Sequence, residues 1–350
     1  NTEFSNPLIH SYLQNKRDLP WRNTTNPYLI WLSEIMLQQT RVAQGLPYFL
    51  AFTEAFPTVF DLANANEEQV LKLWQGLGYY SRARNLHATA KYIAYELNGE
   101  FPNNYKDLIR LKGVGEYTAA AIASFSYNEP VAVVDGNVFR VLSRYFNIDN
   151  DISDGKTKKE FQKLAQEVLP INNPALFNQS IMEFGALQCV PKNPDCNSCV
   201  LNSSCAALQH KKVAQLPVKS KKTKVTNKFF NYLILKDVDA NYIVQKREGK
   251  GIWENLYEFP LMETDELVSE LDFMNQLAEM DFFNQKPTEF FVLNSQIIQH
   301  KLSHQNLYIR FFQLNFDVKL PDSKTLTEIK KLPFPIVIHN FMASNYFNSL

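Results

Sequence analysis

All four cysteines of this chain lie within one segment of 17 residues, in the spacing C-x6-C-x2-C-x5-C: Cys189, Cys196, Cys199 and Cys205. Thiolates gathered this closely are typical of a metal site. Four buried thiols or disulfide-bonded cysteines are the alternative. Structural zinc sites usually contain two C-x2-C pairs, and this segment contains one. The spacing therefore favours a metal centre that is not a zinc knuckle.

A second chemical signal is the segment Leu111-Lys-Gly-Val-Gly-Glu-Tyr-Thr118, in which one residue separates two glycines. Two glycines at this spacing allow a tight turn, and an alanine-rich helix is predicted to begin directly after it. Backbone N–H groups and a helix N-terminus would then face an anion. A plain glycine turn between helices is the alternative, but beside the cysteine segment the anion-binding interpretation is favoured.

Two carboxylates stand in positions that suit acid–base chemistry. Asp135 precedes an apolar helical run, so its alternative role is a structural N-cap. Glu34 lies in the predicted helix Pro27–Arg41, and the residues four before and three after it are apolar. Such a carboxylate is costly unless paired or protonated, so its pKa should rise, although a bond to the backbone or an arginine is the alternative. One protonated and one ionised carboxylate form the pair that glycosidic cleavage needs.

Length and composition predict a globular protein of two domains, with 350 residues and 45% hydrophobic content. No apolar run approaches the ~18 residues of a membrane span, and no signal-peptide pattern opens the chain. Clustered metal-type cysteines then predict a reducing, intracellular setting. Because the net charge is zero, nucleic-acid binding would depend on local patches, helix N-termini and backbone amides.

Helical periodicity dominates the first 216 residues, and it predicts helices over Pro27–Arg41, Glu67–Trp74, Ser81–Leu97, Tyr117–Tyr127, Asn137–Phe146, Lys156–Leu169 and Pro174–Gln188. Residues 217–228 contain five lysines and no acid, which predicts a solvated linker. Beyond it, β-branched and aromatic residues predict strands over Phe229–Lys236, Tyr242–Lys246, Glu289–Gln299 and Asn306–Phe316, with one helix over Asp265–Met280. We therefore expect an α+β protein with an all-α domain over residues 1–216 and an α/β domain over residues 229–350.

Several motifs together resemble those of the MutY adenine DNA glycosylases: Leu19-Pro-Trp-Arg22, Glu34–Arg41, Gly76-Leu-Gly-Tyr-Tyr-Ser-Arg82, the glycine turn, Val134–Val138 and the cysteine segment. The resemblance covers residues 10–210 well and the remainder loosely. It implies a six-helix barrel with a helix-hairpin-helix motif, a 4Fe-4S cluster bound by the four cysteines at 189–205, and a Nudix-like domain. Members of this family remove adenine mispaired with 8-oxoguanine or guanine in base excision repair, so the implied partner is double-stranded DNA, bound by a monomer.

The resemblance also implies roles for individual residues. Glu34 would protonate the departing adenine at N7, Asp135 would stabilise positive charge on the sugar, and Tyr117 and Asn137 would orient both carboxylates. Because a base inside a duplex is unreachable, the adenine would be extruded into a pocket near Arg17, Trp21, Arg22 and Leu37. DNA contacts are implied for Gln39, Thr40, Leu77, Tyr79, Tyr80, Ser81, Gly113, Val114 and Gly115. Gln39 and Tyr79 would fill the gap or wedge the stack beside 8-oxoguanine, whereas a place in the core is the alternative for Tyr79 and Trp21.

The residue at position 117 distinguishes a monofunctional glycosylase from an endonuclease III-like enzyme. Endonuclease III-like enzymes, which act on oxidised pyrimidines, carry a lysine at this hairpin position. An amine can attack the sugar and form a Schiff base, whereas a phenol cannot. The sequence therefore favours a monofunctional glycosylase. A non-catalytic DNA-binding or electron-transfer protein is a further alternative, and the pair of Glu34 and Asp135 argues against it.

The C-terminal part is expected to recognise a base rather than to hydrolyse a nucleotide. After Gly251 the chain lacks the R-E-x2-E-E run with which Nudix hydrolases bind their metal, while Trp253–Pro260 resembles a segment of the MutY family. The family's Phe-Ser-His triplet appears here as Leu302-Ser303-His304, and flanking strands predict that it forms a hairpin tip. Ser303 and His304 would then contact 8-oxoguanine. A surface hairpin without DNA contact is the alternative.

Overall fold

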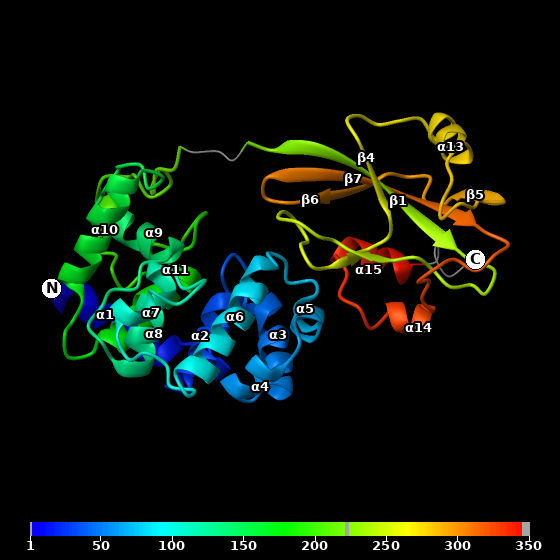
Figure 1. Ribbon diagram of the computed structural model, residues 1–350. Coiled ribbons are helices and arrows are strands. Elements are labelled where there is room, and N and C mark those ends of the chain that lie inside the picture. Colours follow the sequence, from blue (N-terminus) through cyan, green and yellow to red (C-terminus); the bar gives the residue numbers. More distant parts are fainter. Residues whose placement is uncertain (1, 221–223, 345–350) are drawn as a thin grey trace. The chain divides into compact units, whose positions relative to one another are not determined.

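The computed structural model describes residues 2–220 and 224–344, and the chain divides into two compact units (Figure 1). The first unit comprises Asn1–Asn64 and Asn85–Lys221, and the second comprises Ala65–Arg84 and Lys222–Leu350. The second unit is therefore discontinuous in sequence, because residues 65–84 group with the C-terminal domain. In the described part of the chain, no helix has the length and apolar character to cross a membrane.

The first unit is helical (Figure 1). Its helices are α1 (Thr2–Asn15), the 3-10 helix η1 (Pro20–Arg22), α2 (Pro27–Met36), α3 (Val42–Ala55), α4 (Val59–Asn64), α7 (Tyr105–Leu108), α8 (Glu116–Tyr127), α9 (Gly136–Tyr145), α10 (Gly155–Val168), α11 (Pro174–Leu187) and α12 (Ala206–Gln209). Segment 65–84 of the second unit carries α5 (Glu67–Trp74), and α6 (Ser81–Glu96) runs from this segment into the first unit.

Six of the eight helices predicted from the sequence agree with the structure to within one residue at each end. The helix predicted over Asp265–Met280 is shorter than expected, because α13 begins only at Glu270, where the Ser269 side chain caps it by accepting from the Asp272 N–H, and it ends at Ala278. The prediction of a continuous helix over Pro27–Arg41 is wrong, because α2 ends at Met36 and α3 begins at Val42. Between them Gln39 has a left-handed backbone, with φ of 53°. The start of α2 is well specified, since the Asn26 side chain accepts a hydrogen bond from the Tyr28 N–H at 2.9 Å.

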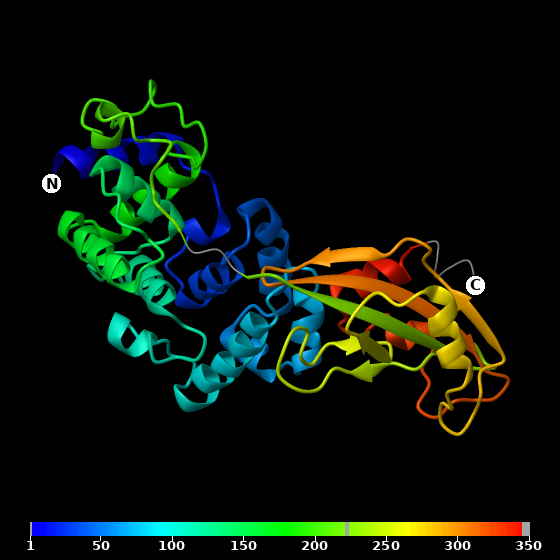
Figure 2. The ribbon, with the colours of Figure 1, turned by 90° about the horizontal axis from the view of Figure 1, so that it is seen from above.

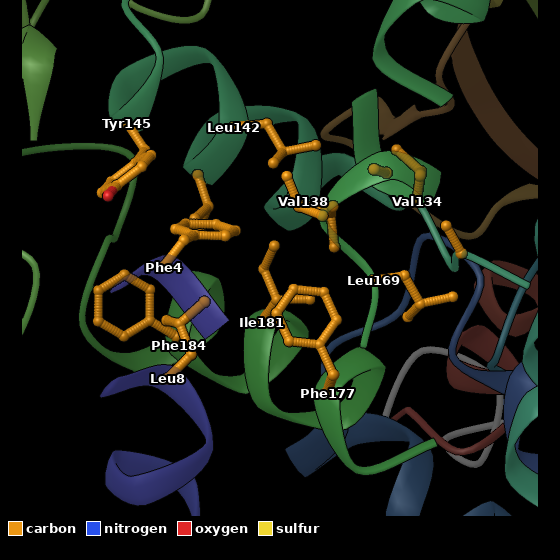
Figure 3. Close-up of a cluster of buried hydrophobic side chains, with 14 of the residues drawn as sticks. Phe4, Leu8, Val134, Val138, Leu142, Tyr145, Leu169, Phe177, Ile181 and Phe184 are labelled. Atoms are coloured by element: carbon orange, nitrogen blue, oxygen red, sulfur yellow. The ribbon is translucent and has the colours of Figure 1, made fainter. Parts of the chain in front are cut away.

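A cluster of buried side chains joins α1, α9, α10 and α11 (Figure 3). Phe4 of α1 contacts the Tyr145 ring of α9 at a centroid distance of 4.5 Å and the Phe177 ring of α11 at 6.1 Å. Burial of each such side chain contributes about 1.5–3 kcal/mol. Gly185 allows the closest approach, because a Cβ there would lie 2.7 Å from the Cβ of Asn137. The packing therefore holds α11 against the start of α9.

The second unit contains a five-stranded sheet of mixed direction (Figure 1). β1 (Thr226–Lys236) pairs in parallel with β7 (Gln305–Asn315), β4 (Leu261–Thr264) is antiparallel to β1, and β5 (Glu289–Val292) and β6 (Ile298–Lys301) are antiparallel to β7. β2 (Gln245–Lys246) and β3 (Tyr257–Glu258) form a separate pair. The single strand predicted over Glu289–Gln299 is thus replaced by two strands, β5 and β6. The strand predicted over Tyr242–Lys246 is shorter than expected, because β2 comprises only Gln245–Lys246.

Helices cover both faces of this sheet. Phe312 of β7 contacts Phe273 of α13 (Glu270–Ala278) at 4.6 Å, whereas its neighbour Phe311 stacks on Phe341 of α15 (Ile336–Met342) at 3.7 Å. Successive residues of a strand point to opposite faces. Accordingly α13 and α15 lie on opposite sides of the sheet, and Figure 2 shows the yellow α13 over the strands. The short α14 (Leu326–Ile329) precedes α15.

Both ends of the predicted lysine-rich linker take part in folded structure. The N–H of Ile152 donates to the carbonyl of Val218 at 2.9 Å, and the N–H of Ser220 donates to Asp151 at 3.3 Å. At the other end, β1 begins at Thr226. Residues 221–223 of the predicted linker lie outside the described residues. The connecting stretch between hydrogen-bonded elements is therefore shorter than the composition suggested.

Candidate active site

A cleft of about 480 Å³ in the first unit is lined by residues from α2, α8, α9, α11 and the segment around η1. It brings together the predicted catalytic and adenine-pocket residues: Glu34, Tyr117, Asp135, Asn137, Arg17, Trp21, Arg22 and Leu37. Thr40, predicted to contact DNA, lines the same cleft. Residues about 100 positions apart in sequence therefore share one site.

Glu34 lies on α2 and is 6% exposed. Its Oε2 accepts a hydrogen bond of 2.6 Å from the hydroxyl of Tyr117, which stands in the first turn of α8. Burial raises the pKa of Glu34 to about 7; the Tyr117 hydrogen bond opposes this rise, and the Asp135 carboxylate adds to it. The predicted rise in pKa is confirmed. A carboxyl group that is half protonated near neutral pH is suited to general acid catalysis.

Asp135 is both an N-cap and a wall of the cleft. Its Oδ1 accepts a hydrogen bond from the Val138 N–H at 2.7 Å, which caps α9, and its Oδ2 accepts one from the Asn137 amide at 2.8 Å. Burial raises the pKa of Asp135, while these two hydrogen bonds oppose the rise by stabilising the carboxylate. The cap and the cleft-lining position are therefore compatible.

Arg140, which the sequence did not single out, fixes the orientation of Asn137. Its Nη2 donates to Asn137 Oδ1 at 2.8 Å and to the Gly185 carbonyl at 2.6 Å, and its Nε donates to the Cys189 carbonyl at 2.7 Å. With Asn137 Oδ1 held by Arg140, the amide nitrogen is free to point at Asp135. The only available signal was the position of Arg140 three residues after Asn137 on a predicted helix.

Glu183 of α11 is the second residue that sequence reasoning missed. Its Oε1 accepts hydrogen bonds from Arg17 Nε at 2.9 Å and from Arg22 Nη1 at 2.8 Å. Burial alone would raise the pKa of Glu183, but the hydrogen bonds from Arg22 and Arg17 outweigh it and lower the pKa to about 2. The cleft thus has a wall of fixed charges of both signs. A lone carboxylate between Met182 and Phe184 was the signal in the sequence.

Trp21 was predicted to line the adenine pocket, with a place in the core as the alternative. Its side chain is buried, and its ring packs edge-on against the Phe49 ring at a centroid distance of 5.1 Å. It nevertheless lines the cleft. A flat aromatic wall facing a ring of hydrogen-bonding groups suits a planar ligand that has polar edges.

The four cysteines line one cavity beside α9 and α11. Arg144 Nη1 donates to Cys189 Sγ, and the Leu201 N–H donates to Cys199 Sγ, each at 3.4 Å. Arg144 also binds the carbonyls of Val190 and Pro191, at 2.8 and 3.0 Å. Within residues 2–220 and 224–344, no three His, Cys, Asp or Glu side chains converge closely enough to hold a single metal ion, so the four thiols surround the cavity without meeting at one point.

The glycine turn before α8 has the features expected of an anion site. Gly113 has φ of 77°, and a Cβ there would lie 2.7 Å from that of Asn85. Gly115 is the N-cap of α8, whose first N–H groups receive no side-chain cap, and a Cβ at Gly115 would meet nothing within 4 Å. The helix N-terminus therefore opens onto free space, where an anion is favoured.

Two of the predicted DNA contacts, Gln39 and Tyr79, have left-handed backbones, with φ of 53° and 47°. Non-glycine residues in this region are strained, and such strain gathers at functional sites. Tyr79 is 44% exposed, which excludes its core alternative. In contrast, the side chains of three other predicted DNA contacts are buried: Leu77, Tyr80 and Val114. Of these three, Tyr80 lines a cleft of the second unit.

A second cleft, of about 510 Å³, lies within the second unit. Tyr79 and Ser81 line it together with Leu302, Ser303 and His304. As predicted, the triplet forms the tip of a hairpin, between the end of β6 and the start of β7. The Leu302 N–H closes the tip by donating to the Gln305 carbonyl at 2.8 Å.

Contacts inside the second unit hold segment 65–84 in place. The Tyr257 hydroxyl donates to Glu68 at 2.6 Å, and the Asn255 amide donates to Glu67 at 2.7 Å. Arg84 Nη1 donates to the Glu254 carbonyl at 2.9 Å. These bonds explain why the tyrosine-bearing turn groups with the C-terminal domain.

Comparison with known protein families gives two matches. Residues 32–167 match the HhH-GPD superfamily base excision DNA repair proteins, and residues 231–344 match the NUDIX domain. An adenine DNA glycosylase of Buchnera aphidicola subsp. Baizongia pistaciae is 37% identical over 294 residues, 84% of this chain and 80% of the relative. The adenine DNA glycosylase of Homo sapiens is 42% identical over 61% of this chain and 41% of its own length.

Solved structures are similar to the helical part. A thermostable thymine-DNA glycosylase matches with a TM-score of 0.55 and 28% identity, covering 59% of this chain and 95% of that protein. An endonuclease III in a non-covalent DNA complex matches in fold, with a TM-score of 0.51 and 23% identity over 58% of this chain and 94% of that one.

Proposed function

This chain belongs to the adenine DNA glycosylase family, and on that premise we propose that it removes adenine mispaired with 8-oxoguanine, or with guanine, from double-stranded DNA. The observation that carries the proposal is the pair of carboxylates in one cleft. Glu34 has its pKa raised by burial to about 7, while Asp135 accepts two hydrogen bonds that favour its charged form. Glycosidic cleavage needs such a proton donor and such a charge stabiliser.

In the proposed mechanism, the adenine is extruded from the duplex into the cleft of the first unit. Glu34 donates its proton to N7 of the base, and the electrons of the C1′–N9 bond leave with the adenine. The carboxylate of Asp135 stabilises the positive charge that develops on the sugar. Water then adds at C1′, directly or after a transient Asp135 adduct, and its proton goes to the carboxylate of Glu34, which restores the acid.

Recognition of the base is assigned to three charged residues that line the same cleft. Arg17, Arg22 and Glu183 present donors and acceptors in fixed positions beside Trp21. Among the described residues, Arg22 Nε is buried and has no hydrogen-bond partner. Because buried polar groups are nearly always paired, this N–H is suited to a ligand atom.

Tyr117 determines the type of glycosylase. Its hydroxyl is bonded to Glu34, and burial keeps its pKa well above the usual value, so it stays neutral. A neutral phenol orients the acid but cannot form a Schiff base with the sugar. The enzyme would therefore release the base without cutting the strand.

We further propose that the four cysteines bind a 4Fe-4S cluster. The residues present fit this group, because all four thiols line one cavity and two sulfurs accept N–H···S hydrogen bonds. Thiolate ligands and N–H donors to sulfur are characteristic of such clusters. When bound, the cluster would link the cysteine segment covalently and hold it against α9.

The remaining contacts with DNA follow from the other elements. The uncapped start of α8 would bind a backbone phosphate without reading sequence. Gln39 and Tyr79 would each contact the DNA, by filling the gap or by wedging the stack beside 8-oxoguanine. Ser303 and His304 would contact 8-oxoguanine in the cleft of the second unit.

The test is release of free adenine under single-turnover conditions from duplexes carrying A opposite 8-oxoguanine, A opposite G, or an oxidised pyrimidine. We expect release from the first two, no borohydride-trapped adduct, and a loss of ~10²–10⁴-fold in Glu34→Gln and in Asp135→Asn. Glu160→Gln, an exposed carboxylate of α10, is the matched control and should retain the wild-type rate. Excision of the oxidised pyrimidine alone would contradict the proposal.

A further inference from the structure

The turn that carries Tyr79 adopts an unfavourable backbone conformation. Gly76, Gly78 and Tyr79 have φ of 96°, 78° and 47°, so three of four consecutive residues lie in the left-handed region. Glycine adopts this region readily, but tyrosine does not. A Cβ at Gly78 would meet nothing within 4 Å, so the turn is loosely surrounded. Something other than close packing must therefore hold the Tyr79 ring in place.

Arg82 supplies the contacts. Its guanidinium carbon lies 5.6 Å from the centre of the Tyr79 ring and 5.2 Å from that of the Trp74 ring. Its Nη2 donates to the carbonyls of Gly78 at 3.1 Å and Leu77 at 3.4 Å. One cation thus contacts the exposed ring and binds the turn that bears it.

Trp74 anchors this arrangement to α5. The Trp74 side chain is fully buried, and its Nε1 donates to the Gly78 carbonyl at 2.9 Å. The guanidinium of Arg82 therefore connects a fully buried ring to the exposed Tyr79 ring. Burial lowers the pKa of Arg82 to about 10, which still leaves the side chain cationic at neutral pH. The cation–π contact is thus present under working conditions.

We propose that Arg82 is a positioning residue, which holds the Tyr79 ring in the exposed pose needed for insertion beside the lesion pair. This proposal rests on the proposed function, in which Tyr79 contacts the DNA. Arg82 would act through Tyr79 and not through a phosphate, because its Nη2 is directed at carbonyls of the turn. Preorganisation of the ring lowers the ordering that DNA binding would otherwise require.

A double-mutant cycle separates this role from a structural one. The probe is a duplex with 8-oxoguanine opposite 2′-fluoro-2′-deoxyadenosine, whose base is not released, and the measured quantity is Kd. Arg82→Met keeps the aliphatic stem on Trp74 and removes the cation. We expect binding about three- to fivefold weaker than wild type, as for the loss of one partly exposed cation–π contact. In a Tyr79→Ala background, the same Arg82→Met change should alter Kd less than twofold.

Arg84→Met is the matched control, because Arg84 lies on the same helix and binds Glu254. Its effect should be the same with and without Tyr79→Ala. An equal loss from Arg82→Met in both backgrounds would overturn the proposal, since Arg82 would then contact DNA directly or support the fold. Arg82→Gln, which removes the cation but keeps an N–H donor for the carbonyls of the turn, serves if the Met variant does not fold, and it should show the same coupling to Tyr79.

Adenine release by the wild-type enzyme distinguishes failure of the proposed function from failure of the proposed role of Arg82. No release from any A-containing mispair would remove the proposed function itself. Normal release, together with a Kd for Arg82→Met equal to that of wild type, would remove only the positioning role of Arg82.

Discussion

The buried Glu34 carboxyl should lower the free energy of unfolding near neutral pH, where it is proposed to act as a general acid. The pKa of Glu34 is about 7 in the folded state and 4.5 for an ordinary glutamate. As pH rises from 4.5 to 7, the unfolded chain loses this proton while the folded chain keeps it, so the free energy of unfolding falls. Above pH 7 the loss is complete and stays constant.

The size of the effect follows from the shift. One pKa unit corresponds to about 1.4 kcal/mol, so a shift from 4.5 to about 7 corresponds to about 3 kcal/mol. Glu34→Gln removes the titration but keeps the shape and an oxygen that accepts from Tyr117. The variant should therefore be more stable than wild type, by about 1 kcal/mol at pH 5.5 and about 3 kcal/mol at pH 8.5.

The assay is thermal unfolding of both proteins across this pH range, with the difference in Tm taken at each pH. For a unit of this size, 3 kcal/mol corresponds to about 6–12 °C. The single-turnover rate of the wild-type enzyme should fall about tenfold per pH unit well above pH 7, because only the protonated acid is active. A pH-independent Tm difference, or a Glu34→Gln variant less stable than wild type at pH 8.5, would refute the assignment of Glu34 as a buried acid.

Three further outcomes are expected. Gly115→Ala should weaken duplex binding about fivefold, because the added methyl group enters the open space before the N-terminus of α8. Gly155→Ala is the control, since Gly155 also stands at a helix start with free space around it, and this variant should bind as wild type does. Equal binding by both variants would exclude the phosphate site. Cys199→Ser should lower the iron content and the visible absorption of anaerobically purified protein, and zinc without iron in the wild type would contradict the cluster. Ser303→Ala combined with His304→Ala should slow adenine release opposite 8-oxoguanine at least about tenfold more than opposite G, and equal slowing would mean that the hairpin does not distinguish the lesion.

The sequence alone was sufficient for features that depend on neighbours in the chain. The N-cap position of Asp135, the glycine turn at 113–115, the spacing of the cysteines and the hairpin at 302–304 involve residues only a few positions apart. Turn and cap preferences act over such distances, so residue type and spacing specify them. The apolar helical neighbours of Glu34 likewise predicted its burial, and burial is the main cause of its raised pKa.

Features that depend on distant contacts required the tertiary structure. The carboxylate of Glu183 is held between Arg17 and Arg22, more than 160 positions away, and Arg140 links Asn137 to the backbone of Cys189. No local pattern specifies such partners, because they are brought together by the packing of α11 against α1 and α9. The grouping of residues 65–84 with the C-terminal domain has the same origin, since the hydrogen bonds of Glu67, Glu68 and Arg84 to residues 254–257 override chain order.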